Sequence, residues 1–369
     1  MPSRNQIISW LLKPVSWLYG CVMGVRNWMF DNKLLPVVEY DVPVVSVGNI
    51  TVGGTGKTPH VEYIINELCM TYNIAVLSRG YKRKTKGFLL ANSTSTPDSV
   101  GDEPLQIYHK FGNQVKVAVC ENRRHGISEL LRQFPDIQLI LLDDAFQHRF
   151  VKPKVSILLS DYNRPIYRDH LLPLGRLREN WKQVERADMV VVTKCPAQVS
   201  PIDVRLICKE LGGDQATKGL NPRPYQSLFF SQVVYGGLLP VFPDDKPYHV
   251  TLGGLTERDT VLLLTGIANP RGFVRYFKNY PFKVVVCHYP DHHDFQRKDI
   301  ENIKKKFDSL TGERKMIITT EKDAIRLAYN PYVPTKLKPL TFYLPIAVQM
   351  MPKQDGSDFI RDLKARIEA

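Results

Sequence analysis

Hydrophobic and polar positions alternate along the chain as short strand-like runs separated by helix-like patterns. Up to residue 193, apolar runs of four to six residues predict buried strands. These runs are Val44–Val47, Ile74–Ser78, Val115–Cys120, Leu139–Leu142, Val155–Ser160 and Met189–Thr193. Helical patterns lie between several of them, near 59–70, 103–111 and 123–133. This alternation indicates an α/β fold whose mostly parallel sheet is covered on both faces.

A polar stretch at 212–224, rich in Gly and Pro, separates this region from a second set of runs. The set comprises extended runs at Ser227–Tyr235 and Tyr248–Leu252, followed by Val261–Thr265, Lys283–Cys287, Lys315–Thr319 and Thr341–Leu344. We therefore expect a helical region at 1–35, an α/β core at 36–222, and a smaller C-terminal α/β lobe at 223–369 that closes a cleft. The tail after about residue 346 carries no recognisable motif.

The N-terminal region has an unusual composition for a surface helix. Residues 7–30 are mostly apolar, and they include Trp10, Trp17 and Trp28. No acidic residue precedes Asp31, and Pro14 interrupts a stretch that is a poor membrane span and a poor signal peptide. Tryptophan with sparse basic charge suits an amphipathic helix lying in the membrane interface. A helix buried against the core is the alternative.

Composition narrows the class of partner. The chain has 369 residues, 43% of them hydrophobic and 24% charged, which are values typical of globular proteins. Its net charge of +13 favours anionic partners such as nucleotides, phosphorylated substrates, nucleic acids or anionic lipids. The six cysteines are scattered without a CxxC pair, so we expect a reducing compartment and neither a disulfide framework nor a zinc site.

The strongest chemical signal is the glycine-rich segment 48–59, directly after the first predicted strand. Glycines allow backbone N–H groups to close around phosphate oxygens, and the following helix adds its positive N-terminal dipole. Lys57 can reach the β- and γ-phosphates, and the Thr58 hydroxyl can hold Mg²⁺. The strict pattern has Gly at the position of Thr51. We predict that ATP is bound by Thr51, Val52, Gly53, Gly54, Thr55, Gly56, Lys57 and Thr58.

A second signal is the apolar run that ends in Asp143 and Asp144. P-loop enzymes use such a strand to hold Mg²⁺ beside the triphosphate, and one or two carboxylates suffice because phosphates fill part of the metal's coordination shell. Together with Thr58, these carboxylates are the predicted metal site.

Four further segments have open interpretations from their residues alone. Asp102, before a predicted helix, is a helix cap or a functional carboxylate. The cluster at 291–294 is a metal site, a general base or a solvated turn. Arginines in the turn at 172–179 clamp phosphate or lie on the surface. The basic run at 79–86 is a solvated loop or faces phosphate or lipid headgroups.

Five segments occur together in the order typical of one enzyme family. They are Gly48-Asn-Ile-Thr-Val-Gly-Gly-Thr-Gly-Lys-Thr-Pro59, Leu77-Ser-Arg-Gly-Tyr81, Val100-Gly-Asp-Glu-Pro104, Leu142-Asp-Asp-Ala-Phe-Gln-His148 and Asp291-His292. In these segments, from about residue 10 to 345, the chain resembles the tetraacyldisaccharide 4'-kinase (lipid A 4'-kinase) family of Gram-negative bacteria. The phosphate loop of this family departs from the strict pattern in the same way, at the position of Thr51.

The resemblance implies a P-loop NTPase-like core and a reaction. ATP, with Mg²⁺, phosphorylates the 4'-hydroxyl of an acylated glucosamine disaccharide 1-phosphate. The implied catalytic residues are Asp102, His292, Lys57 and Arg178, with the first two resembling a pair that activates the sugar hydroxyl. Glu103, His148 and Glu179 are implied as supporting residues. The roles of His292 relative to His293, and of Arg178 relative to Arg176, rest on the family pattern alone.

The resemblance also implies a place in the cell. Family members are peripheral proteins on the cytoplasmic face of the bacterial inner membrane, and we expect a monomer that binds no nucleic acid.

Two other classes compete with the kinase. A P-loop switch GTPase should carry Asn-Lys-x-Asp, but the nearest segment, Thr193-Lys194-Cys195-Pro196, lacks the final Asp. A nucleic-acid-binding protein fits the charge, but no basic and aromatic RNA motif or helix-turn-helix accompanies it.

Overall fold

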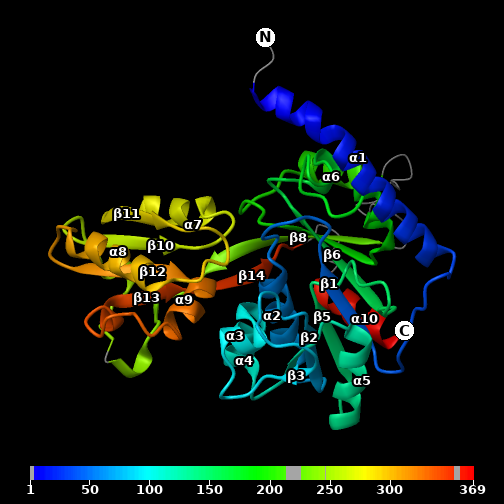
Figure 1. The fold of residues 1–369 in the computed structure, drawn as a ribbon, viewed down its shortest axis with the longest axis horizontal. Coiled ribbons are helices and arrows are strands. Elements are labelled where there is room, and N and C mark those ends of the chain that lie inside the picture. The colour runs from blue at the N-terminus through cyan, green and yellow to red at the C-terminus, as the bar shows by residue number, and fades with distance from the viewer. Residues whose placement is uncertain (1–3, 213–225, 246, 353–357) are drawn as a thin grey trace.

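The protein folds into two α/β units, each built on its own sheet (Figure 1). The computed structural model describes residues 4–212, 226–245, 247–352 and 358–369. The predicted α/β class with a largely parallel sheet is confirmed. The polar stretch predicted as a boundary, 212–224, lies outside the described residues except for Gly212.

The larger unit has a nine-stranded sheet in the order β14-β8-β7-β6-β1-β5-β2-β4-β3. Every neighbouring pair from β8 to β4 is parallel, and both edge pairs are antiparallel. Its first strands are β1 (Val44–Gly48), β2 (Ile74–Ser78), β3 (Leu89–Leu90), β4 (Lys116–Val119), β5 (Leu139–Asp143), β6 (Val155–Asp161) and β7 (Met189–Thr193). Its helices include α2 (Lys57–Leu68), α3 (Pro97–Val100), α4 (Asp102–Phe111), α5 (Arg123–Gln133) and α6 (Pro201–Gly212). Buried apolar side chains on both faces of β5 explain why the strand reads as a continuous hydrophobic run.

The smaller unit has a five-stranded sheet in the order β11-β10-β12-β13-β9. Its strands are β9 (Leu239–Pro240), β10 (Thr260–Thr265), β11 (Lys283–His288), β12 (Lys315–Thr320) and β13 (Thr341–Leu344). Its helices are α7 (Arg271–Tyr276), α8 (Arg297–Asp308) and α9 (Glu321–Ala328). The extended run expected at Tyr248–Leu252 is not a strand, because its backbone joins neither sheet and instead leads into the short helical turn Leu252–Gly254.

Two antiparallel strands join the units. β8 (Ser227–Tyr235) leaves the large sheet, and β14 (Ile346–Met350) returns beside it (Figure 1). The terminal helix α10 (Phe359–Glu368) then packs in the core of the larger unit, where the ring of Phe359 lies 5.3 Å from that of Phe229. The sequence expectation assigned 223–369 to the smaller lobe, whereas these three elements belong with the larger one, because their apolar side chains are buried there.

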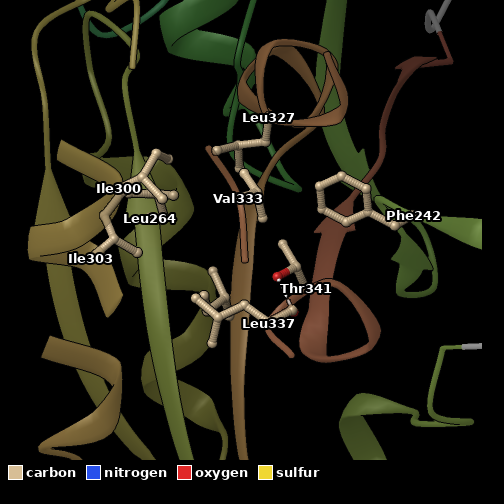
Figure 2. Close-up of a pocket in the computed structure, with 9 residues that line it drawn as sticks. Phe242, Leu264, Ile300, Ile303, Leu327, Val333, Leu337 and Thr341 are labelled. Carbon is tan, nitrogen blue, oxygen red and sulfur yellow. Dashed lines mark hydrogen bonds between the residues drawn. The ribbon is translucent and has the colours of Figure 1, made fainter. Parts of the chain in front are cut away.

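A small cavity in the smaller unit is a packing feature. Figure 2 shows it among apolar side chains that include Phe242, Leu264 and Leu327. Its volume is about 20 Å³, room for roughly one water. The hydroxyl of Thr341 donates to the carbonyl of Leu337 at 2.7 Å, so this polar lining group already has a partner. A substrate site must therefore be sought elsewhere.

The N-terminal helix α1 (Arg4–Asp31) lies beside the larger unit (Figure 1). Its polar residues Ser16 and Asn27 are buried together with Phe30, whereas Trp10 and Trp17 are 73% and 71% exposed. Trp28 is also exposed, at 57%. Within the described residues, no helix has the length and apolar character needed to cross a membrane.

Candidate active site between the two units

The phosphate loop connects β1 to α2. The strand ends at Gly48, where a Cβ would lie 2.7 Å from that of Phe146, so only glycine allows this approach. Gly53 and Gly56 have φ values of 113° and 89°, in the left-handed region that favours glycine. Helix α2 begins at Lys57, which aims its N-terminal N–H groups and dipole at the loop.

Side chains from the loop itself and from the end of β7 hold this loop in shape. The Asn49 amide donates to the Thr55 hydroxyl at 2.6 Å, and the Thr193 hydroxyl from the end of β7 donates to the carbonyl of Thr55 at 2.9 Å. The Lys194 ammonium donates to the carbonyl of Gly54. The backbone of Thr51 forms a bridge with Leu177. Hydrogen bonds within the protein therefore preorganise the phosphate loop for binding.

The predicted metal-side carboxylates lie at the carboxyl end of β5, next to β1. Asp144 has a φ of 49° and its carboxylate lies 3.6 Å from the Lys57 ammonium. Burial, followed by the nearby charges of Glu103 and Asp144, raises the pKa of Asp143 well above its ordinary range. Thr58, in the first turn of α2, is also buried.

These residues fit Mg²⁺. Both carboxylate oxygens of Asp143 are buried and lack a hydrogen-bond partner among the described residues. A hard cation satisfies such oxygens. Burying a charged carboxylate without a partner costs free energy, and a bound cation would offset that cost. In the described part of the chain, no group of three or more His, Cys, Asp or Glu could hold a metal unaided. That agrees with a metal site in which phosphate oxygens of the nucleotide supply the remaining ligands.

Both candidate arginines lie against the phosphate loop. The Arg178 guanidinium is 3.4 Å from the Asp144 carboxylate and 3.3 Å from the side-chain oxygen of Gln147. Its backbone N–H donates to the carbonyl of Ile50 at 2.7 Å. The Arg176 guanidinium lies 3.8 Å from where a Cβ of Gly53 would be. Arg178 therefore lies beside the Asp144 carboxylate, and Arg176 lies beside Gly53 of the loop.

The supporting residues differ in what they contact. Glu179 is fully buried and accepts hydrogen bonds from Arg186 at 2.7 Å and from Asn27 of α1 at 3.1 Å. It thus ties the N-terminal helix to the active-site segment. Burial, with nearby arginines led by Arg123, lowers the pKa of His148 to about 4, so its ring is neutral near pH 7.

The smaller unit brings His292 to Asp102 of the larger unit. The two residues are 190 positions apart, and His292 Nδ1 lies 3.2 Å from the Asp102 carboxylate. His292 has a φ of 55°, and its N–H donates to the carbonyl of Gly266 at 3.2 Å. His293 instead contacts Asp299 at 2.9 Å, so its ring is engaged within the smaller unit. Of the two neighbouring histidines, His292 is the one that faces Asp102.

Electrostatics favours an ionised Asp102. Burial opposes ionisation, but hydrogen bonds from His292 and Arg326 outweigh it and lower the pKa of Asp102 to about 2. Asp102 also begins α4, where the helix dipole favours a negative charge. The helix-cap alternative for Asp102 is wrong, because the cap position is Gly101 and no side chain makes a cap hydrogen bond there.

Helix α9 supplies two site residues that the sequence analysis missed. The Arg326 guanidinium donates to Asp102 through Nε at 2.9 Å and also through Nη2. The Lys322 ammonium lies 2.8 Å from His292 Nε2 and 3.1 Å from the Glu103 carboxylate. Lys322 and Arg326 are four residues apart directly after a buried strand, which puts both on one helix face. This four-residue spacing was the sequence signal from which the two residues could have been identified.

The basic run and an ion-pair cluster complete the contacts between the units. The Lys82 ammonium donates to the carbonyl of His292 at 3.2 Å, and the ring of Tyr81 lies 5.1 Å from the His292 ring. On α4, Lys110 pairs with Glu62 of α2 at 2.7 Å and with Glu321 of α9 at 2.6 Å. Helices α4 and α9 therefore form much of the interface (Figure 1).

Comparisons with known proteins agree on one family. The family model described as LpxK, tetraacyldisaccharide-1-P 4'-kinase, matches residues 8–367. A tetraacyldisaccharide 4'-kinase of Bacteroides thetaiotaomicron is 48% identical over 356 residues, 95% of this chain and 90% of that protein. A second, from Phocaeicola vulgatus, is 45% identical over 351 residues, 95% of this chain and 92% of its own length.

A solved structure extends this similarity to three dimensions. It is the crystal structure of the "apo" form of LpxK from Aquifex aeolicus in complex with ATP. It superposes with a TM-score of 0.70 at 28% identity, covering 98% of this chain and 99% of that one.

Proposed function

The chain belongs to the tetraacyldisaccharide-1-P 4'-kinase family, and from that premise we propose how its residues transfer phosphate from ATP to the 4'-hydroxyl of a lipid A disaccharide precursor. The observation that carries the proposal is the pairing of His292, from the smaller unit, with Asp102 of the larger unit, which also carries the phosphate loop. The acceptor we infer is a tetraacyl glucosamine disaccharide 1-phosphate. ATP binding is supported by the ATP complex of the Aquifex aeolicus relative.

The phosphate loop and its flanking cations bind and orient the triphosphate. Backbone N–H groups of the loop and the Lys57 ammonium hold the β- and γ-phosphates, and Arg178 neutralises charge that develops in transfer. Thr58, Asp143 and Asp144 would hold Mg²⁺, which when bound neutralises and orients the triphosphate oxygens. Fixed donors are effective here because they need no reorganisation during the reaction.

The dyad handles the proton. His292 Nδ1–H donates to Asp102, which leaves Nε2 as the acceptor for the proton of the 4'-hydroxyl. As the hydroxyl oxygen bonds to the γ-phosphorus, the bond from that phosphorus to the β–γ bridging oxygen breaks and ADP leaves. The proton ends on Nε2. Such general-base assistance contributes about 10²–10⁴-fold to the rate.

The N-terminal helix is proposed to hold the enzyme, as a monomer, at the cytoplasmic face of the bacterial inner membrane. The exposed tryptophans Trp10, Trp17 and Trp28 share α1 with the basic residue Arg26, and a Trp-rich helix suits the interface between headgroups and acyl chains. The same helix contacts the active-site segment, since the Tyr19 hydroxyl donates to the carbonyl of Arg178 at 2.8 Å. A lipid acceptor would then enter the cleft from the surface that α1 contacts.

The experiment that tests this function follows the γ-phosphate. The enzyme is incubated with γ-labelled ATP, Mg²⁺ and the acylated disaccharide 1-phosphate in detergent micelles, and label in the lipid is counted. The matched control is the same acceptor without its 4'-hydroxyl. We expect label in the first lipid only. Label found solely as inorganic phosphate, with or without acceptor, would identify an ATP-driven switch instead.

A further inference from the structure

The ring nitrogen of His292 that should accept the substrate proton already has a partner in this structure. The Lys322 ammonium lies 2.8 Å from Nε2. An ammonium has only donors, so Nε2 facing it must be an acceptor. A neutral imidazole carries one ring proton, which then lies on Nδ1, where the Asp102 carboxylate at 3.2 Å accepts it and Arg326 Nη2 lies at the same distance. Lys322 therefore stabilises the tautomer with its proton on Nδ1, which is the one that a base at Nε2 needs. At the same time its ammonium occupies the Nε2 lone pair that would accept the substrate proton.

Two carboxylates near Lys322 can pair with its ammonium when it leaves Nε2. Its ammonium is 3.1 Å from the Glu103 carboxylate and 3.8 Å from that of Asp291. Its side chain is 20% exposed and ends a flexible four-carbon stem, so a small rotation exchanges one acceptor for another. When Nε2 is released, the charge stays paired. The cost of uncovering the base is consequently small.

The contact of Lys322 with Nε2 does not hold the units together, because both residues belong to the smaller unit. Arg326 connects the units beside the ion pair of Lys322 with Glu103, since it donates to Asp102 and pairs with Asp323 of its own helix at 3.0 Å. Asp323 in turn accepts from the N–H of Gly266 at 2.8 Å, and the Gly266 carbonyl accepts from the N–H of His292. Moving the Lys322 ammonium from Nε2 toward Glu103 therefore breaks no link between the units.

We propose that Lys322 shields the base from water and yields it only to the sugar hydroxyl, making it a specificity-determining residue of the transfer. The inference rests on the role proposed above for the dyad. An uncovered Nε2 beside bound ATP accepts a proton from water as readily as from a sugar. Water oxygen would then bond to the γ-phosphorus, the bond to the bridging oxygen would break, and the products would be ADP and inorganic phosphate, with the proton on Nε2.

The acceptor displaces the shield because it brings binding energy that water lacks. A disaccharide held by its acyl chains and its 1-phosphate presents the hydroxyl at a fixed position, which converts displacement of Lys322 into an intramolecular event. A single water has no such advantage. Discrimination between the two nucleophiles follows from this difference.

The test measures ATP hydrolysis without acceptor in Lys322→Met, which removes the donor, with Lys305→Met as the matched control because Lys305 is an exposed lysine on α8 of the same unit. We expect hydrolysis to rise by about tenfold or more in Lys322→Met, through the general base that is uncovered. The control should match the wild type. Lys322→Arg, which keeps a donor on Nε2, should also stay low.

Two outcomes separate this inference from its premise. In Lys322→Met, adding His292→Gln should abolish the extra hydrolysis; if it does not, the hydrolysis has another origin and the shield is refuted. Unchanged or lower hydrolysis in folded Lys322→Met likewise overturns the inference. Failure of the wild type to label the lipid acceptor would instead remove the proposed function, and that is measured in a separate assay.

Discussion

The pairing of Asp102 with His292 is the feature whose removal is most informative, and a double-mutant cycle tests it. The variants are Asp102→Asn, His292→Gln and the combination. Asp102 contacts Nδ1 at 3.2 Å, so losing the carboxylate releases the ring, whereas losing the ring leaves the carboxylate without a proton carrier. Both single changes remove the same base. We expect each to lower kcat by about 10²–10⁴-fold, which is about 3–5.5 kcal/mol.

The double variant should be little worse than the worse single variant, because residues that act as one unit are strongly non-additive. Simple additivity would give losses of about 10⁴–10⁸-fold, so the coupling energy should reach about 3–5 kcal/mol. The assay is single-turnover transfer at saturating ATP and acceptor, with ATP affinity measured separately. ATP affinity should change little, since neither residue lies in the phosphate loop.

A control separates loss of the base from loss of contact between the units, because Asp102 also binds Arg326. Glu321→Gln removes an ion pair between α9 and Lys110 that does not involve the dyad. It should lower kcat far less than either dyad variant. Additive losses in the cycle, or an equal loss in Glu321→Gln, would refute the reasoning and leave Asp102 as a residue that only connects the two units.

Three further predictions concern the phosphate site, the membrane surface and pH. Lys57→Ala should lower transfer by about 10²–10³-fold in a folded protein, and near-normal turnover would remove the loop from the mechanism. Changing Trp10 and Trp17 to Ser should lower vesicle partitioning by about tenfold for each Trp, as co-sedimentation would report; unchanged partitioning would contradict insertion of this face. The depressed pKa of Asp102, about 2 against 3.8, contributes about 2 kcal/mol of stability that is present above about pH 5 and lost as pH falls toward 2. Urea unfolding should therefore show wild type and Asp102→Asn converging in acid, and a constant difference would contradict the assignment.

The sequence by itself determined the local features of this protein. Period-two and continuous apolar runs depend on neighbours in the chain, so they located strands such as β1 and β5 within a residue or two. The phosphate loop is also local, because a strand, glycines and Lys57 in succession are enough to build it. The tail after residue 346 lacked such a signal, and its return to the larger unit was missed.

Only the tertiary structure decided which distant side chains meet. Arg326 and Asp102 are 224 positions apart, and their contact depends on how two separately folded sheets dock. The spacing of Lys322 and Arg326 places both on one helix face, but it does not show what that face contacts, since a lysine on a helix is usually solvated. The sequence likewise did not determine the orientation of α1, because its composition allowed either side to face the protein. In the structure the side that carries Asn27 faces the buried Glu179. A buried carboxylate needs hydrogen bonds, and Asn27 of α1 supplies one of them.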